Sequence, residues 1–273
     1  MTEGIASSQN HNIKLVASLK QKKYRDEKGL FIAEGIRLVE DAVNSNWQIE
    51  LCIHTEQAIQ NQRMQEIVEK LEEKKCRIYQ VSKAIYEKIT ETKEPQGILL
   101  VLKKQVSCLT DFVVEGKIPM LIVLDRLQDP GNVGTIVRTA EAASCTGIIM
   151  MKGTADLFSS KTVRATMGAM FRLPIVVDIE CMELLDFIKK QAIGLLITAL
   201  DPTAKQYFTV DFTKPTAMVF GNEGNGVSAE LLQQADHKVY IPMSGNSESL
   251  NVAAATAVII YESVRQRLLY NRQ

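Results

Sequence analysis

The chain has 273 residues, of which 46% are hydrophobic and 23% charged, a composition typical of folded globular proteins that argues against extended disorder. Lysine plus arginine and aspartate plus glutamate both total 32, so overall charge neither indicates nor excludes a nucleic-acid partner. The length predicts one large domain or two modest ones.

Cysteine usage and hydropathy restrict the compartment. Five scattered cysteines without a Cys-x-x-Cys pair argue against a disulfide framework and a zinc cluster, so we expect no metal. The opening MTEGIASSQN has no basic stretch followed by an apolar run, and no segment approaches the roughly 18 apolar residues of a spanning helix. We therefore expect a cytoplasmic protein that is neither exported nor inserted in a membrane.

Residues 11 to 105 alternate between helical and strand patterns. Three strands are predicted at 49–53, 77–81 and 97–102, and four helices at 12–20, 34–43, 58–74 and from Lys83 onward. This alternation predicts a small α/β domain over residues 1–105. The polar stretch that follows has no sustained periodicity, so we place a linker at 106–117 and a second domain at 118–273.

The second domain opens a new series of apolar strands. They are predicted in MLIVLD (120–125), GIIMM (147–151), IVV (175–177), GLLITAL (194–200), AMVF (217–220) and KVYIP (238–242). Strands that are apolar on both faces and alternate with helices predict a parallel, doubly wound sheet. Ligands bind such sheets beyond the carboxyl ends of the strands, where three loops rich in glycine and asparagine are expected.

The first of these loops contains Asn132 and Arg138 in the stretch RLQDPGNVGTIVRTAEAA. Asn132 follows Pro130 and Gly131, so it is either a helix N-cap or a catalytic residue. Arg138 has apolar neighbours in the sequence, where an unpaired guanidinium is costly. A structural ion pair and a phosphate contact both stay open for it.

The second and third loops carry further candidates. Gly221 to Gly226 reads GNEGNG, which is neither a Rossmann fingerprint nor a P-loop and could be no more than a tight connection. Ser249 and Asn251 end the third loop and could cap the alanine-rich helix that follows. That helix is expected to pack on the sheet or on another subunit.

Together, N-x-G-x-x-x-R, G-x-E-G-x-G, and I-P-M followed by S-L-N resemble the signature motifs of the SpoU (TrmH) family of RNA ribose 2′-O-methyltransferases, in the SPOUT superfamily. The stretch TVRATMGAMFRLP resembles this family too, and KLVASLKQKKYRDEKGLFIAEGIRLVEDAV resembles its L30e-like substrate-binding domain. The resemblance implies a parallel-sheet α/β methyltransferase domain with a trefoil knot, preceded by a small L30e-like α/β domain. It also implies a homodimer.

The resemblance further implies that S-adenosyl-L-methionine is the cofactor. The residues implied to bind it are Leu200, Gly221, Gly226, Ile241, Met243 and Leu250. The residues implied in catalysis are Arg138, Asn132, Glu223, Ser249 and Asn251. Because arginine stays protonated, we favour Arg138 as a group that binds phosphate and orients or polarises the hydroxyl, with direct action as a base left open.

A basic stretch in the first domain is the candidate RNA-binding surface. Residues 11–28 hold six basic residues against two acidic ones, an excess of four in a neutral protein. The residues proposed to bind RNA are Lys14, Lys20, Lys22, Lys23 and Arg25. The alternative is a solvated helix face without a ligand.

The sequence thus predicts an enzyme that methylates a ribose 2′-hydroxyl of RNA, most favourably 23S rRNA because the L30e-like domain resembles that of rRNA-modifying members. Transfer RNA is the alternative substrate. A catalytically silent RNA- or ribosome-binding protein of the same fold is a second hypothesis. A nucleotide-dependent oxidoreductase is disfavoured because the early Gly-x-Gly-x-x-Gly turn is missing.

Overall fold

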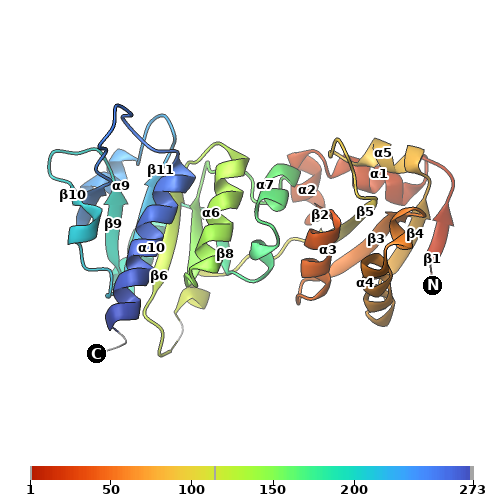
Figure 1. The fold of residues 1–273 in the computed structure, drawn as a ribbon, viewed down its shortest axis with the longest axis horizontal. Coiled ribbons are helices and arrows are strands. Elements are labelled where there is room, and N and C mark those ends of the chain that lie inside the picture. Colours follow the sequence, from red (N-terminus) through yellow and green to blue (C-terminus); the bar gives the residue numbers. More distant parts are fainter. Residues whose placement is uncertain (1, 114, 271–273) are drawn as a thin grey trace. The chain divides into compact units, whose positions relative to one another are not determined.

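The structure, a computed structural model, describes residues 2–113 and 115–270 (Figure 1). Contacts divide the chain into two units. Unit 1 comprises the chain up to Gln105 together with Phe158–Arg172, and unit 2 comprises Val106–Leu157 and the chain from Leu173 onward. The grouping of Phe158–Arg172 with unit 1 is a feature that a single linear boundary at 106–117 does not anticipate.

Unit 1 contains a five-stranded mixed sheet in the described part of the chain, in the order β1-β4-β3-β5-β2. β1, β4 and β3 are parallel, whereas β5 pairs antiparallel with both β3 and β2. The strands are β1 (Thr2–Ile5), β2 (Leu30–Glu34), β3 (Ile49–Thr55), β4 (Arg77–Val81) and β5 (Ile98–Lys103). The sequence predicted β3, β4 and β5 but not the two edge strands.

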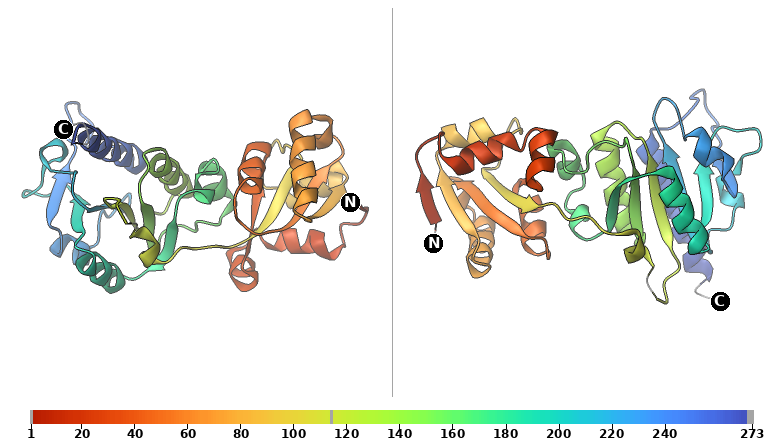
Figure 2. Two further views of the ribbon diagram at one scale, coloured as in Figure 1. Left: turned by 90° about the horizontal axis from the view of Figure 1, so that it is seen from below. Right: turned by 180° about the vertical axis from the view of Figure 1, so that it is seen from behind.

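Helices cover both faces of this sheet (Figure 2). They are α1 (His11–Ser18), α2 (Lys22–Lys28), α3 (Ile36–Val43), α4 (Gln62–Glu73), α5 (Lys83–Ile89) and α7 (Ser160–Ala165), with the 3₁₀ turns η1 (Ala58–Gln60) and η3 (Ala169–Phe171). The helix expected over 58–74 is divided because the Asn61 side chain accepts a hydrogen bond from the Arg63 N–H and so starts α4 anew.

The helix expected to start at Glu34 begins later than predicted. Glu34 ends strand β2, and Gly35 then turns the chain with φ 107°, a value that favours glycine. The Glu34 carboxylate is buried and accepts hydrogen bonds from the hydroxyls of Tyr86, Thr90 and Thr92. These hydroxyls come from a distant part of the sequence, so local periodicity could not reveal them.

Unit 2 contains a seven-stranded parallel sheet within the described residues, in the order β10-β12-β9-β11-β6-β7-β8. The strands are β6 (Met120–Asp125), β7 (Gly147–Met151), β8 (Ile175–Ile179), β9 (Gly194–Thr198), β10 (Lys205–Gln206), β11 (Thr216–Gly221) and β12 (His237–Tyr240). The predicted parallel sheet and its six predicted strands are confirmed. The short edge strand β10 was missed.

α6 (Pro130–Ala142) and α10 (Val252–Tyr270) lie side by side on one face of this sheet, and α8 (Cys181–Lys190) lies on the other (Figure 2). The remaining elements are α9 (Ala229–Gln233), η2 (Leu109–Phe112) and η4 (Tyr207–Thr209). The central strands β6 and β11 are buried over nearly their whole length, since both faces are covered.

Arg267 holds the C-terminal end of α10 against the sheet by hydrogen bonds. Its guanidinium donates hydrogen bonds to the carbonyls of Phe212, Ile118, Pro119 and Lys214, at distances of 2.9 to 3.0 Å. These carbonyls precede strands β6 and β11, so one side chain fixes the helix to both strands. α10 in turn begins directly after the third loop, and its position therefore fixes where that loop ends.

Candidate cofactor and ribose site

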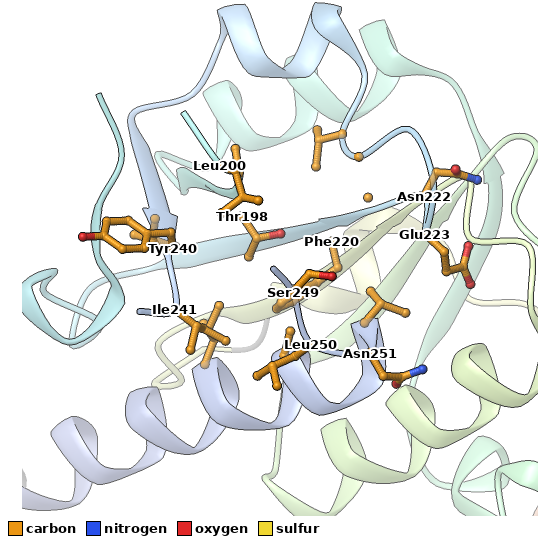
Figure 3. A pocket seen from close by; sticks show the side chains of 18 of the residues that line it. Thr198, Leu200, Phe220, Asn222, Glu223, Tyr240, Ile241, Ser249, Leu250 and Asn251 are labelled. Atoms are coloured by element: carbon orange, nitrogen blue, oxygen red, sulfur yellow. The ribbon is translucent and has the colours of Figure 1, made fainter. Parts of the chain in front are cut away.

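The loops after β9, β11 and β12 enclose a cavity of about 710 Å³ at the carboxyl edge of the sheet (Figure 3). We call it the first cavity. It is lined by Thr198, Ala199, Leu200, Phe220, Gly221, Asn222, Glu223, Asn225, Gly226, Val227, Leu232, Val239, Tyr240, Ile241, Met243, Glu248, Ser249, Leu250, Asn251, Val252, Ala255 and Ile259. Its position agrees with the rule that parallel sheets bind ligands beyond their carboxyl ends.

The structure brings the six sequence-predicted cofactor residues together. Leu200, Gly221, Gly226, Ile241, Met243 and Leu250 line the first cavity. Tyr240 and Ile241 lie at one side of it, and Asn222, Glu223 and Asn251 lie at the other (Figure 3). The cavity thus has an apolar side and a polar side.

The glycines of the second loop allow the two ends of the loop to approach each other closely. A Cβ built on Gly221 would lie 2.3 Å from the carbonyl carbon of Gly226 and from the nitrogen of Val227. Asn222 and Gly226 exchange two backbone hydrogen bonds, and Gly226 has φ 67°, in the left-handed region. The loop therefore returns on itself, and glycine is required where its two ends meet.

Asn222 is a residue that sequence reasoning missed. Its side-chain oxygen accepts hydrogen bonds from the backbone N–H groups of Gly224 and Asn225, and its amide donates to the carbonyl of Arg126 at 2.9 Å. Asn222 therefore shapes its own loop and binds that loop to the first one. Asparagine before a glycine-rich turn is a recognisable Asx-turn signal, which could have identified it.

The predicted capping role of Asn132 is wrong. α6 starts three residues earlier than such a cap would place it, at Pro130, and its N-cap is Asp129, whose side chain accepts from the Asn132 backbone N–H at 2.9 Å. Proline favours the first helical turn because it has no N–H to leave unpaired. The Asn132 side chain is consequently free to bind other loops.

Glu223 is held by three donors from the first loop. The backbone N–H groups of Gln128 and Asp129 and the side-chain amide of Asn132 donate to its carboxylate at 3.0, 3.2 and 3.0 Å. Burial alone would raise the pKa of Glu223, but the hydrogen bond from Gln128, followed by that from Asn132, outweighs it, so the pKa is lowered. Glu223 is therefore a carboxylate at neutral pH.

Asn251 extends this network to the third loop. Its amide donates to the side-chain oxygen of Asn132 at 3.0 Å, while its own oxygen accepts from the Ala253 N–H at 2.9 Å, at the start of α10. The residue is thus both a helix cap and a link between loops. Ser249, two residues earlier, is exposed and lines the first cavity.

Arg138 lies apart from the first cavity's lining. It is exposed on the solvent side of α6, together with Thr135, whereas Ile136, Val137 and Ala140 face the core. The argument that its apolar sequence neighbours make the guanidinium costly is therefore wrong, because consecutive helical residues point in different directions. Among the described residues Arg138 has no hydrogen bond or ion pair. The structure therefore excludes the structural ion pair that the sequence left open, and the N–H donors of Arg138 are available to a ligand.

The basic stretch divides into buried and exposed cations. Arg25 is only 5% exposed, and its guanidinium donates to the carbonyls of Leu19 and Lys20 at 2.8 Å, so its assignment to an RNA-binding surface is corrected to a structural role. The Lys20 ammonium donates to two carbonyls near the end of α5, at 2.9 and 3.0 Å. Lys14, Lys22 and Lys23 are exposed.

Residues 2–113 and 115–270 offer neither a metal centre nor a membrane span. They contain no group of three or more His, Cys, Asp or Glu residues arranged to hold a metal ion. The same residues include no helix that is long and apolar enough to cross a membrane.

The sequence profile of the SpoU rRNA Methylase family matches residues 119–261, and that of the MRM3-like substrate binding domain matches residues 10–100. The chain is 33% identical to the Bacillus subtilis 23S rRNA (guanosine(2553)-2′-O)-methyltransferase RlmP, over 94% of this chain and 97% of that protein. It is 29% identical to a 23S rRNA (uridine(2479)-2′-O)-methyltransferase of Streptomyces viridochromogenes, over 92% of this chain and 88% of that protein.

Solved structures agree with these matches. An AdoMet-bound rRNA methyltransferase from Sinorhizobium meliloti superposes with a TM-score of 0.86 at 32% identity, covering 97% of this chain and 98% of that one. The SpoU methyltransferase AviRb from Streptomyces viridochromogenes, in complex with AdoMet, superposes with a TM-score of 0.84 at 28% identity, covering 95% of this chain and 99% of that one.

Proposed function

The chain belongs to the SpoU rRNA methylase family, and from this premise we propose that it transfers a methyl group from S-adenosylmethionine to a ribose 2′-hydroxyl of 23S rRNA. The observation that carries the proposal is the first cavity with its hydrogen-bonded rim. A pocket with an apolar side and a rim of fixed polar groups suits a cofactor and a ribose meeting at one place.

The first cavity fits S-adenosylmethionine by the chemistry of its lining. Leu200 is 78% exposed and Leu250 is 40% exposed, so large apolar side chains are available to cover an adenine ring. Backbone groups of the second and third loops provide polar contacts for the ribose and the amino-acid part. When bound, the cofactor supplies an electrophilic sulfonium methyl group.

On the acceptor side, we assign positioning roles to three residues. Asn132, in the first turn of α6, bonds to both Glu223 of the second loop and Asn251 of the third, so the polar rim is preorganised before RNA binds. The lowered pKa of Glu223 keeps a negative charge there at neutral pH. Ser249 lies at the same cavity and is assigned to orienting the ribose.

We assign binding of the RNA phosphate and polarisation of the 2′-hydroxyl to Arg138. Its exposed guanidinium offers five N–H donors in a planar fork, a geometry that matches phosphate oxygens. A guanidinium remains protonated, so its contribution is to orient the hydroxyl and stabilise its developing negative charge. This role requires Arg138 to affect turnover more than cofactor affinity.

The decisive experiment is methylation of defined RNA. Purified protein is incubated with S-adenosylmethionine labelled in the methyl group and, separately, with transcribed unmodified 23S rRNA and transcribed tRNA. Incorporation into 23S rRNA at a 2′-hydroxyl, mapped by resistance to alkaline cleavage, is expected. Label in tRNA alone would identify tRNA, and not 23S rRNA, as the substrate. Cofactor binding without label in any RNA would favour the catalytically silent alternative.

We also propose a homodimer that uses the exposed side of α10. Val258, Tyr261 and Leu268 are 36%, 51% and 58% exposed, and their spacing places them along one side of the helix. A second copy of the chain is the proposed occupant because α10 starts at Val252, directly after Asn251, so a dimer here would join two cofactor sites. Light scattering should give about twice the chain mass, and Tyr261→Arg should shift it to monomer.

The second and third loops meet at one cavity, and α10 follows the third loop directly. This arrangement supports a trefoil knot over these segments.

A cytoplasmic location is supported by the free thiols of the five cysteines, Cys52, Cys76, Cys108, Cys145 and Cys181.

A further inference from the structure

We infer that a second cavity, beside the first, holds the base of the target nucleotide and selects guanine; this inference rests on the proposed function. The second cavity has a volume of about 570 Å³ and lies at the carboxyl ends of β6, β7 and β8. The polar side chains of its lining are Arg126, Lys152, Glu180, Cys181 and Glu230, together with the end of β6 at Asp125.

The two cavities share a wall. Asn225, Val227 and Leu232 line both of them, so the second loop and helix α9 separate one from the other. A ribose at the first cavity carries its base on the same sugar, one glycosidic bond away. The second cavity is therefore within reach of the base, and enzymes that act on single nucleotides read the unstacked base in such a pocket.

Arg126 is held rigidly at the edge of the second cavity. Its φ of 59° is an unfavourable conformation for arginine. Three hydrogen bonds keep it there: its N–H donates to the Thr154 hydroxyl at 3.1 Å, and its carbonyl accepts from Asn222 at 2.9 Å and Gln128 at 2.8 Å. A backbone strained and fixed in this way points to a side chain with a defined task.

The guanidinium of Arg126 is oriented by a buried carboxylate. Nε and Nη2 donate to Asp125 at 2.9 and 3.4 Å, and Asp125, with a side chain only 2% exposed, also accepts from the Ser228 N–H at 2.7 Å. Within the described chain, Nη1 of Arg126 has no hydrogen-bond partner. Half-exposed and preorganised, it offers donors that suit the O6 and N7 acceptors of guanine.

The second cavity also contains carboxylates that could accept hydrogen bonds from the N–H groups of a base. Lys152 pairs with Glu180, whereas Glu230 forms no ion pair with any described residue. Burial, followed by the neighbouring Glu230 carboxylate, raises the pKa of Cys181, so the thiol stays protonated beside that carboxylate. Glu230 thus lines the second cavity as an acceptor for hydrogen-bond donors of a ligand.

Charge decides which ligand this arrangement favours. The pairs Asp125 with Arg126 and Lys152 with Glu180 cancel, which leaves the negative charge of Glu230. A phosphate would be repelled, whereas a neutral base with N–H donors would be attracted. Guanine presents adjacent N1–H and N2–H donors for a carboxylate together with the O6 and N7 acceptors, whereas uracil presents one N–H donor.

The test compares Glu230→Gln and Arg126→Lys with Glu183→Gln, a matched control on the exposed surface of α8 outside both cavities. On transcribed 23S rRNA, the first two should lose about 10- to 100-fold in kcat/KM with S-adenosylmethionine affinity unchanged by calorimetry, and the control should match the wild type. The mapped methylated nucleotide should be a guanosine.

A second arm replaces that guanosine with inosine, which lacks the N2 amine. Inosine should reduce kcat/KM of the wild type by a larger factor than that of Glu230→Gln, because the substitution already weakens the contact that inosine lacks. Methylation of a base other than guanine, or wild-type kinetics for both cavity variants, would overturn the inference while leaving the proposed function intact. A wild-type protein that methylates no RNA would instead refute the proposed function.

Discussion

The three-loop cluster of unit 2 and the basic stretch of unit 1 organise their polar side chains in opposite ways. In the cluster, Glu223 is bound by groups 91 to 95 residues away in the sequence, and Asn132 joins it to Asn251. In the basic stretch, Lys14 and Lys22 are exposed cations at the surface.

This difference has consequences for function. A cluster whose members hold one another acts as a unit, so a single change should affect several contacts at once. Exposed lysines act through charge, which is graded, roughly additive and screened by salt. The following changes test this comparison, from the largest expected effect to the smallest.

Gly221→Ala should have the largest effect. The added Cβ would lie 2.3 Å from backbone atoms of Gly226 and Val227, so the loop must open and the cofactor affinity should fall by at least about 100-fold. Gly224→Ala is the matched control, because its Cβ would lie 3.6 Å from the nearest atom, an ordinary contact. Calorimetric titration with S-adenosylmethionine measures both, and equal affinities would contradict the role given to Gly221.

Arg138→Ala should reduce kcat by about 100- to 1000-fold while the affinity for S-adenosylmethionine stays within about twofold. The reason is that Arg138 lies outside the first cavity's lining but is proposed to act on the RNA. Single-turnover methylation measures the first quantity and calorimetry the second. Parallel loss of both would show that Arg138 supports the cofactor loops instead.

Asn132→Asp should reduce kcat/KM by roughly 10- to 100-fold, because it replaces a hydrogen-bond donor with a carboxylate that faces Glu223. Adding Glu223→Gln should restore part of the activity, since an amide can donate to the new carboxylate. Strictly additive losses in this double-mutant cycle would mean that the two residues act independently.

The lowered pKa of Glu223 sets a pH dependence with a defined sign. A folded pKa below the unfolded one stabilises the fold at pH values above the unfolded pKa, and this contribution disappears as the pH falls through the folded pKa. The difference in unfolding temperature between wild type and Glu223→Gln should therefore persist at neutral pH and shrink in acid. A difference that grows in acid would give the opposite sign and refute the assignment.

Lys14→Gln, Lys22→Gln and Lys23→Gln should have the smallest effects. Each should weaken RNA binding only modestly and lower the salt dependence of the affinity by about one unit of log–log slope. Arg25→Gln should behave differently, with a loss of about 1 to 3 kcal/mol in the free energy of unfolding, because it leaves buried carbonyls without a donor. Filter binding at several salt concentrations and thermal unfolding distinguish the two cases.

Most strands of both sheets were predictable because apolar runs reflect burial locally. MLIVLD and GIIMM, for example, are buried along their length as β6 and β7. The edge strands β1 and β2 and the division of the helix at Asn61 were missed, since pairing at an edge and a side-chain cap depend on partners or on one polar atom. Helix boundaries shifted for the same reason, as Asp129 rather than Asn132 caps α6.

The sequence by itself determined the fold class, the order of the three loops and the family to which they belong, because strand hydropathy and loop motifs are local properties of the chain. Only the tertiary structure decided which of those residues meet. It joined Asn132 to Glu223 and Asn251, turned Arg138 to solvent and buried Arg25. These outcomes depend on the directions of side chains and on contacts between segments about 90 to 120 residues apart, which no local pattern encodes.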